Sequence, residues 1–243
     1  AEECGFLLPE WYQINSLNDL KKCAKKLNFK AILKTNSFGY DGKGQTTISK
    51  KTNLDKVWSD INYNDCVLEQ KIDFNREISI LYAKSADKSD WFFPISENIH
   101  ENGILRKTFG PASINKKILA RIRDLTTTLS NKLSLTGLIT IEMFQLKDGK
   151  IIFNEIAPRP HNSFHWTIEG CLNSQFDILI KCMCGHPISN EPSYGKWIMK
   201  NIIGEEIFRF SEILANKKNK CHIYGKKEIK KGRKMGHFNQ RID

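Results

Sequence analysis

The segment GLITIEMFQLKDGKIIFNEIA, residues 137–157, holds the most informative pattern in the sequence. Residues 137–146 and 150–157 are apolar and rich in β-branched and aromatic side chains, which is typical of buried strands. Asp148-Gly149 lies between them and is a strong signal for a two-residue turn. The segment therefore predicts a β-hairpin.

The turn also predicts which side chains face each other. With a two-residue turn, Lys147 pairs with Lys150, and counting back along both strands sets Glu142 directly opposite Glu155. Opposed side chains lie about 5 Å apart, and like charges there are destabilising. At an effective dielectric constant near 20 the repulsion is roughly 3 kcal/mol. Both strands are apolar on both faces, so we expect them at the centre of a sheet, where screening is weak.

A divalent cation between the two carboxylates would remove this repulsion, and hard oxygen ligands suit Mg²⁺. The hairpin alone is also compatible with arrangements that need no metal. In the first of these arrangements one glutamate is protonated, and in the second one glutamate is bonded to a nearby arginine or lysine. In the third the strand register is shifted, so that the two glutamates are not opposed. In the predicted register Asn154 lies beside the pair and points to the other face.

A second motif, NSFGYDGKGQ at residues 36–45, follows a predicted strand at residues 29–35. Its spacing matches neither GxxxxGK[ST] nor GxGxxG. Its three glycines would let backbone N–H groups approach an anion, and Lys34 and Lys43 add positive charge. A segment of this kind is usually an ordinary flexible loop. Together with paired carboxylates, however, it favours a site for Mg–ATP.

Periodicity and capping signals predict the other elements. A helix capped by Asn15-Ser16 covers residues 17–27, and another covers residues 115–133. We expect further strands at 66–72, 76–83 and 91–99, a helix at 174–184, and short strands separated by basic turns at 197–204, 221–226 and 234–239.

Composition excludes several classes of protein. A chain of 243 residues can form one or two domains with a substantial core. No apolar run approaches the ~18 residues of a transmembrane helix, and the first residues do not indicate secretion. The seven cysteines have no zinc-site spacing, which favours a reduced, cytosol-like compartment. The net charge of +11 comes mostly from lysine, which indicates a solvated surface more than nucleic-acid binding, although it would also attract nucleotides.

Longer strings point to a family. They are FKAILKTNSFGYDGKGQ, EQKIDFNREISI, FPISENIHENGIL, NEIAPRPHNSFHWTIEGCLNSQFD and HIYGKKEIKKGRKMGHFN. Together they resemble the 5-(carboxyamino)imidazole ribonucleotide synthases, ATP-grasp enzymes of de novo purine synthesis, over nearly the whole chain. The resemblance implies an α+β fold with an ATP-grasp domain at 1–190, divided into a smaller subdomain at 1–70 and a larger one at 71–190. A small β-rich domain at 191–243 would follow.

The resemblance also implies an activity. ATP would phosphorylate bicarbonate to carboxyphosphate, which would then carboxylate the amine of 5-aminoimidazole ribonucleotide and release ADP and phosphate. The implied cofactors are ATP and Mg²⁺, and the implied partners are the small-molecule substrates, without nucleic acid or membrane. A cytoplasmic homodimer is expected.

Motif matching then implies roles for single residues. The implied ATP contacts are Lys34, Gly39, Tyr40, Asp41, Gly42, Lys43, Gly44, Gln45, Glu69, Gln70, Lys71, Ile72, Glu77, His100, Asn154 and Glu155. The implied magnesium ligands are Glu142 and Glu155, the pair that the hairpin already sets face to face. The implied catalytic residues are Asp41, Arg159 and His161. The implied substrate contacts are Tyr40, Ser163, Lys226, Arg233 and Lys234.

The chemistry of these residues suits their implied roles. Asp41 is a plausible acceptor for the proton of the attacking amine. Arg159 offers a charged fork to a planar oxyanion such as bicarbonate, and His161 can bind it or shuttle a proton.

The sequence departs from the family at three points. The N-terminal Rossmann-like domain is absent from the sequence, so we expect weak or incomplete turnover from this chain alone. Phe164 replaces a residue that is usually small, and its ring would either narrow the carboxyphosphate pocket or repack outward. Ala157 stands where some other ATP-grasp enzymes carry a third, amide ligand.

Two alternatives compete with this interpretation. The first is another ATP-grasp carboxylase or ligase, such as a biotin carboxylase-like enzyme or a formate-using transformylase, against which the strings PRPHNS and HIYGK argue. The second is a basic binding module on a degenerate ATP-grasp scaffold, which would have no reason to keep opposed carboxylates.

Overall fold

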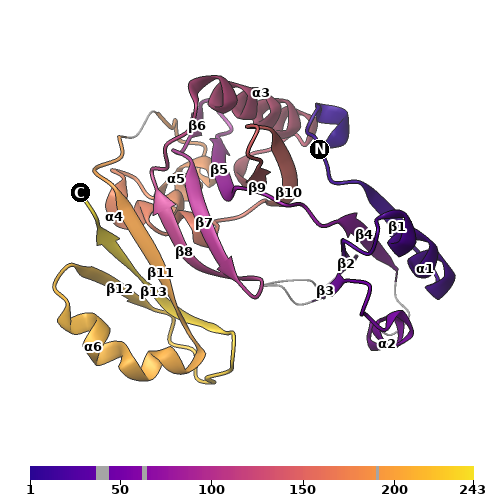
Figure 1. Cartoon of the computed structure of the whole chain (residues 1–243). Coiled ribbons are helices and arrows are strands. Elements are labelled where there is room, and N and C mark those ends of the chain that lie inside the picture. Colours follow the sequence, from indigo (N-terminus) through magenta and orange to yellow (C-terminus); the bar gives the residue numbers. More distant parts are fainter. Residues whose placement is uncertain (37–43, 62–64, 190–191) are drawn as a thin grey trace.

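Two β-sheets organise the computed structural model, which describes residues 1–36, 44–61, 65–189 and 192–243 (Figure 1). In these residues a four-stranded sheet lies beside a nine-stranded one. The predicted mixture of helix and strand in an α+β fold is confirmed. Every helix in the described residues is too short or too polar to span a bilayer.

The smaller sheet has the order β1-β4-β2-β3. Its elements are β1 (Trp11–Ile14), α1 (Leu17–Lys26), β2 (Ala31–Thr35), β3 (Gln45–Ile48), α2 (Leu54–Asp60) and β4 (Cys66–Gln70). The predicted first helix is confirmed, because the Ser16 hydroxyl accepts a hydrogen bond from the Asp19 amide at its N-terminus. Leu20 and Ala24 on α1 pack with Leu33 and Leu68 into one core.

The larger sheet has the order β10-β9-β5-β7-β8-β11-β13-β12, and β6 also pairs with β5. Its strands are β5 (Arg76–Lys84), β6 (Asp90–Phe92), β7 (Ser96–Glu101), β8 (Ile104–Gly110), β9 (Gly137–Gln145), β10 (Ile151–Ala157), β11 (Trp197–Ile203), β12 (Asn219–Ile223) and β13 (Lys234–Arg241). The predicted single strand at 91–99 is two strands, since Pro94 has no amide hydrogen for the ladder.

Helices cover both faces of this sheet. Helix α3 (Lys116–Lys132), which matches the predicted long helix, packs on one face, and Ile78 and Ile80 of β5 lie beneath it. Helix α5 (Gln175–Met183), also as predicted, packs with Leu81 and Ala83 on the other face, together with short helices η2 (Asn162–Phe164) and α4 (Thr167–Gly170). The central strands are therefore buried on both sides, as their continuous apolar sequence indicates.

The C-terminal strands continue the larger sheet, because β11 pairs with both β8 and β13. Between β11 and β12 the chain forms η3 (Gly204–Arg209) and α6 (Phe210–Ala215), whereas the sequence predicted only turns there. At the other end, η1 (Glu2–Cys4) precedes Leu7, which bridges to Ile152 of β10. Residues from both termini thus join the larger sheet.

Candidate functional site

The hairpin of β9 and β10 brings two carboxylates together, but by a different route from the predicted one. The loop has three residues, since Leu146 and Lys150 are joined by a hydrogen bond of 2.9 Å and Gly149 has a left-handed φ of +87°. Ile151 therefore pairs with Gln145, one residue away from prediction. A β-bulge between Phe153 and Glu155 shifts the register by one residue, so that the pairs beyond it are the predicted ones.

The bulge determines which side chains enter the site. Glu155 pairs with Glu142 beyond it, so the predicted opposition of these two residues is confirmed. Phe153 faces the core beneath α3, and strict alternation would then turn Glu155 to that same face. The extra residue, Asn154, prevents this. The prediction that Asn154 points away is wrong, because its side-chain oxygen accepts a 3.4 Å hydrogen bond from Lys34 across the site.

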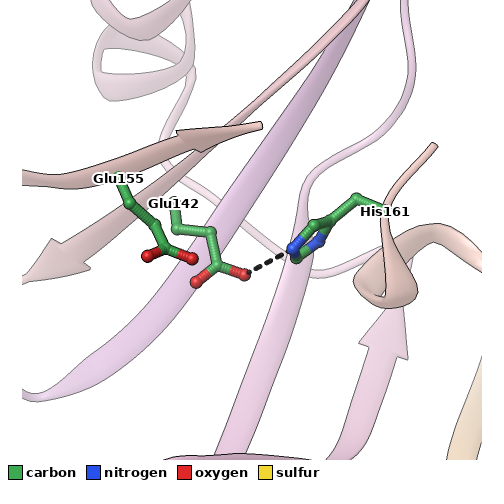
Figure 2. A group of neighbouring side chains, drawn as sticks. All are labelled: Glu142, Glu155 and His161. Carbon is green, nitrogen blue, oxygen red and sulfur yellow. Dashed lines mark ion pairs between the residues drawn. The ribbon is translucent and has the colours of Figure 1, made fainter. Parts of the chain in front are cut away.

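Glu142, Glu155 and His161 form a group whose ligand atoms all lie within 4.8 Å of one another (Figure 2). Glu142 is buried, Glu155 is exposed, and His161 is buried. His161 Nε2 lies 3.5 Å from Glu142 Oε1. The site thus presents one half of a carboxylate pair to solvent and keeps the other half within the protein.

Burial raises the pKa of Glu142 to about 7, and the carboxylates of Glu155 and Glu77 add to the shift, while His100 and Lys234 oppose it. The positive side chains near Glu142 and Glu155 therefore do not balance the negative charge of the two carboxylates. Two converging carboxylates with unbalanced negative charge fit a hard divalent cation such as Mg²⁺.

His161 is held by contacts on both its backbone and its ring. Gln175 on α5 accepts from the His161 amide at 2.8 Å and donates to its carbonyl at 2.9 Å. The ring nitrogen Nδ1 lies 2.8 Å from the Ser163 hydroxyl and accepts from the Ser163 amide at 3.3 Å. Burial, followed by the positive charges of Arg159 and Lys234, lowers the pKa of His161 to about 3, so the ring is neutral.

A second group connects the two sheets. Lys34 on β2 forms an ion pair of 2.6 Å with Glu69 on β4 and also donates to Asn154 on β10. These three residues were all predicted as ATP contacts. The structure brings them together next to Glu155.

Glu77 and His100 form a third group on adjacent strands. His100 Nδ1 forms a hydrogen bond with the Glu77 carboxylate. Burial disfavours protonation of His100, but its hydrogen bond and charge interaction with Glu77 outweigh that effect and raise its pKa. Glu77 and His100 also act electrostatically on Glu142, so this pair lies close to the carboxylate site.

The remaining predicted residues occupy several positions. The positive charge of Lys234 lowers the pKa values of Glu142 and His161. Lys226 donates a hydrogen bond of 2.8 Å to the backbone carbonyl of Lys234. Arg159 is exposed and donates to the Pro160 carbonyl. Arg233 donates to the Glu228 carbonyl and forms an ion pair with the Glu228 carboxylate.

The predicted nucleotide-loop and hinge residues are only partly described. Gly44 precedes β3 and Gln45 begins it, while Gln70 ends β4 and donates its amide to Glu10. Lys71 and Ile72 follow, and the Lys71 amide bonds to Lys30. The predicted contacts outside the described residues are Gly39, Tyr40, Asp41, Gly42 and Lys43.

Ser163 and Phe164 are both fully buried. The Ser163 hydroxyl accepts from Ser79 and contacts His161. The Phe164 ring packs edge-on against Phe93 inside the core. The Phe164 ring is therefore part of the core and does not lie at the surface.

Sequence reasoning missed several polar residues that support the site. They are Ser79, Asn98, Thr108, Gln175 and Asn201, all buried. Ser79 interrupts the apolar run ISILYA, whereas Asn98 lies in the more polar segment ISENI. A lone polar residue in a strand buried on both faces signals a buried hydrogen-bond partner, and this signal could have identified Ser79 but not Asn98.

Comparisons with known proteins identify the family to which the fold belongs. Residues 1–176 match the ATP-grasp domain, and residues 198–241 match the phosphoribosylaminoimidazole carboxylase C-terminal domain. The chain is 39% identical over 228 residues to the N5-carboxyaminoimidazole ribonucleotide synthase of Bacillus subtilis, covering 93% of this chain and 60% of that protein.

Solved structures are similar over the full length of the chain. The N5-carboxyaminoimidazole synthetase of Staphylococcus aureus, complexed with ADP, has a TM-score of 0.93 at 32% identity and covers 100% of this chain. The enzyme of Aspergillus clavatus, in complex with ADP and 5-aminoimidazole ribonucleotide, has a TM-score of 0.87 at 26% identity and covers 99%. This chain spans only 65% and 66% of those two chains.

Proposed function

The chain belongs to the ATP-grasp family, among the N5-carboxyaminoimidazole ribonucleotide synthases, and on that premise we propose that it serves ATP-dependent carboxylation of 5-aminoimidazole ribonucleotide. The product would be 5-(carboxyamino)imidazole ribonucleotide, an intermediate of de novo purine synthesis. The observation that carries this proposal is the opposed pair Glu142 and Glu155 beside the buried His161.

Glu142 and Glu155 would hold Mg²⁺. When bound, the cation would neutralise charge on the ATP phosphates during phosphoryl transfer. Lys34 and Asn154 would contact the phosphates, which requires Lys34 to exchange some of its contact with Glu69 for the nucleotide. Residues 69–72 would bind the adenine, Glu77 the ribose hydroxyls, and His100 the nucleotide next to Glu77.

The reaction then has two steps. An oxygen of bicarbonate attacks the γ-phosphorus, a new P–O bond forms, the bond to the bridging oxygen breaks, and ADP leaves. The amine of 5-aminoimidazole ribonucleotide next attacks the carboxyl carbon of carboxyphosphate. A C–N bond forms, the C–O bond between the carboxyl carbon and the phosphate breaks, inorganic phosphate leaves, and Asp41 accepts the amine proton.

Charges near the carboxylates support the placement of the anions. Arg159 and His161 would bind bicarbonate and carboxyphosphate, with Arg159 as a charged fork and His161 as a neutral hydrogen-bonding partner. Lys226, Arg233 and Lys234 would bind the phosphate of the ribonucleotide. The electrostatic effect of Lys234 on both Glu142 and His161 supports its assignment, and Tyr40 is proposed as a further substrate contact. Ser163, which the sequence also predicted as a substrate contact, is fully buried and hydrogen-bonded to Ser79 and His161, so we propose that it acts on the substrate through His161.

We also propose the division into an ATP-grasp domain at 1–190 and a C-terminal unit at 191–243, with subdomains at 1–70 and 71–190. A homodimer in the cytoplasm is part of the same proposal. Sedimentation velocity would test the assembly, with a dimer expected and a monomer at micromolar concentration contradicting it.

The activity is tested by measuring ADP release with each candidate substrate in turn. Release should require both bicarbonate and 5-aminoimidazole ribonucleotide, and neither formate nor biotin should replace them. Dependence on formate or biotin would instead identify another ATP-grasp ligase. A salt-dependent shift of RNA in a gel, with no thermal shift from nucleotide, would identify a binding module and contradict the proposal.

A further inference from the structure

A continuous row of buried polar side chains runs across three neighbouring strands to His161. The Thr108 hydroxyl on β8 donates to the side-chain oxygen Oδ1 of Asn98 on β7 at 3.0 Å, and the side-chain nitrogen Nδ2 of Asn98 donates to the Ser79 hydroxyl on β5 at 3.0 Å. The Ser79 hydroxyl donates to Ser163 at 2.9 Å, and Ser163 Oγ lies 2.8 Å from His161 Nδ1. We call Thr108, Asn98, Ser79 and Ser163 the buried relay.

The relay is sealed from solvent. Thr108, Ser79 and Ser163 are 0% exposed and Asn98 is 4% exposed. Polar groups at such positions are costly unless every member is satisfied. Here each member bonds the next, so the row is satisfied internally and ends at a ring that faces the carboxylate pair.

The hydrogen bonds of the buried relay are donated in one direction, from Thr108 toward His161. Because Ser163 Oγ accepts a hydrogen bond from the Ser79 hydroxyl, the hydroxyl hydrogen of Ser163 is available for donation to His161 Nδ1. The backbone amide of Ser163 points at the same nitrogen, at 3.3 Å, and a backbone N–H can only donate. Both contacts therefore make Nδ1 an acceptor. In a neutral imidazole the proton must then reside on Nε2.

We propose that the buried relay is a positioning device that fixes His161 as the Nε2–H tautomer, so that this ring donates a hydrogen bond at the carboxylate pair and is not a third metal ligand. The nitrogen that carries this proton, Nε2, lies 3.5 Å from Glu142 Oε1. A nitrogen that carries a proton has no lone pair for a cation, so of these three side chains only Glu142 and Glu155 would hold the metal.

The consequence for the reaction rests on the proposed function. With its lone pair directed at Ser163, His161 presents only a donor to the site, and a donor binds an oxygen of bicarbonate or carboxyphosphate. Ser79, Asn98 and Thr108 touch no substrate in this scheme and act only through His161.

The tautomer can be read directly by two-bond ¹H–¹⁵N correlation spectroscopy of the ¹⁵N-histidine-labelled chain, with His161→Gln used to assign the signals. We expect Nδ1 to resonate as an unprotonated nitrogen and Nε2 as a protonated one, before and after addition of Mg²⁺ and ADP. A proton on Nδ1, or loss of the Nε2 proton when Mg²⁺ is added, would overturn the proposal. This readout needs no turnover, so it can fail or succeed independently of the proposed activity.

Variants of the relay provide the second arm. Ser163→Ala should shift the Nδ1 signal toward the protonated region, because one of its two donors is lost and both tautomers become populated. The matched control is Ser96→Ala, since Ser96 is also 0% exposed on β7 but accepts from Trp166 Nε1 outside the relay. An unchanged His161 spectrum in folded Ser163→Ala, or an equal shift in Ser96→Ala, would contradict the relay.

A kinetic measurement separates positioning from general stability. In an active preparation, Ser79→Ala should raise the KM for bicarbonate roughly three- to tenfold, the size expected when one buried hydrogen bond is lost, and leave the KM for ATP near the wild-type value. Equal effects on both constants would indicate a merely structural role.

Discussion

At Glu142, burial and the neighbouring carboxylate of Glu155 act in the same direction. Both raise the pKa of Glu142, and the local positive groups do not cancel the shift. In the absence of a cation the folded state therefore holds a proton that the unfolded chain has released, between the ordinary pKa of 4.5 and about 7. Folding stability from this group is present at low pH and is lost as the pH rises through that window.

Glu142→Gln should remove this dependence. Relative to wild type without metal, the free energy of unfolding of the variant should increase between about pH 4.5 and 7, by about 3 kcal/mol at most. Urea unfolding at several pH values measures the difference. Mg²⁺ should stabilise the wild type more at about pH 8 than at about pH 5, because protons compete with the cation, and should have little effect on the variant.

A constant difference between Glu142→Gln and wild type across this pH range would contradict the electrostatic origin of the effect. Asp148→Asn is the matched control, because Asp148 is an exposed carboxylate on the same hairpin that pairs with Lys150.

Single residues also show how far sequence reasoning reaches. Glu142 and Glu155 were predictable because each is the one charged residue of its strongly apolar strand in the β9–β10 hairpin. Ser79 and Asn98 were harder to assign, since their partners come from η2 and β8, which no local spacing connects to them. The ring of Phe164 was predicted to lie at the surface or in the pocket, yet a core position next to Phe93 was available to it.

At the scale of elements, the β9–β10 hairpin shows two deviations that cancel. The three-residue loop shifts the register by one, and the bulge at Asn154 shifts it back before Glu155. The sequence contains a good turn signal at Asp148-Gly149, but it does not distinguish a two-residue loop from a three-residue one. The residue types around Asn154 do not indicate a bulge. The pairing of Glu142 with Glu155 was therefore predicted correctly, whereas the register between the loop and the bulge was predicted incorrectly.

Deletion of Asn154 tests this description. The deletion joins Phe153 directly to Glu155, so Phe153 still pairs with Met143 and Glu155 still pairs with Glu142. We expect a folded chain that keeps its stabilisation by Mg²⁺ but binds ATP more weakly, because the contact of Asn154 with Lys34 is lost. Thermal unfolding with Mg²⁺ and with ATP measures both effects.

Deletion of Ile152 is the control for that experiment. It places Phe153 opposite Phe144 and turns it out of the core beneath α3, so we expect a marked loss of stability. If the two deletions destabilised the chain equally, the bulge would not have the role described here.

A stack of three imidazoles connects the C-terminal strands to the loop after η2. His237 on β13 lies between His165 and His222, with ring centroids 4.6 and 4.7 Å apart. The Tyr224 hydroxyl contacts His237 Nδ1, and Glu169 pairs with His222. Burial, followed by the charges of His165 and His222, lowers the pKa of His237 to about 2.

The stack predicts acid sensitivity. Between the ordinary pKa of 6.5 and about 2, the unfolded chain binds a proton at His237 that the folded chain excludes, so stability falls as the pH falls. His237→Gln should reduce the slope of the unfolding free energy against pH by up to ~1.4 kcal/mol per pH unit below pH 6.5. Urea titrations between about pH 6.5 and 4.5 measure that slope, with the exposed His186→Gln as control. An identical slope in wild type and His237→Gln would refute the assignment.

At the scale of the whole molecule, the two sheets meet where Lys34, Glu69 and Asn154 make contact. Most strands and helices were predictable, because apolar periodicity and caps are local signals. The continuation of the larger sheet through β11, β13 and β12 was not predictable, since β8–β11 pairing joins residues about ninety positions apart in the chain. The net charge of +11 has named partners at a few lysines and arginines, and we interpret the remainder as solvated surface.

The central claim is that the carboxylate pair at the junction of the sheets holds the cation of a nucleotide site. Isothermal titration of ATP in the presence of Mg²⁺, into the wild type and into Glu142→Gln/Glu155→Gln, tests it most directly. We predict Mg²⁺-dependent binding to the wild type and a loss of at least about tenfold in affinity in the double variant, since a hydrogen-bonding amide cannot replace a charged ligand. Equal Mg–ATP affinity in the two proteins would contradict the claim.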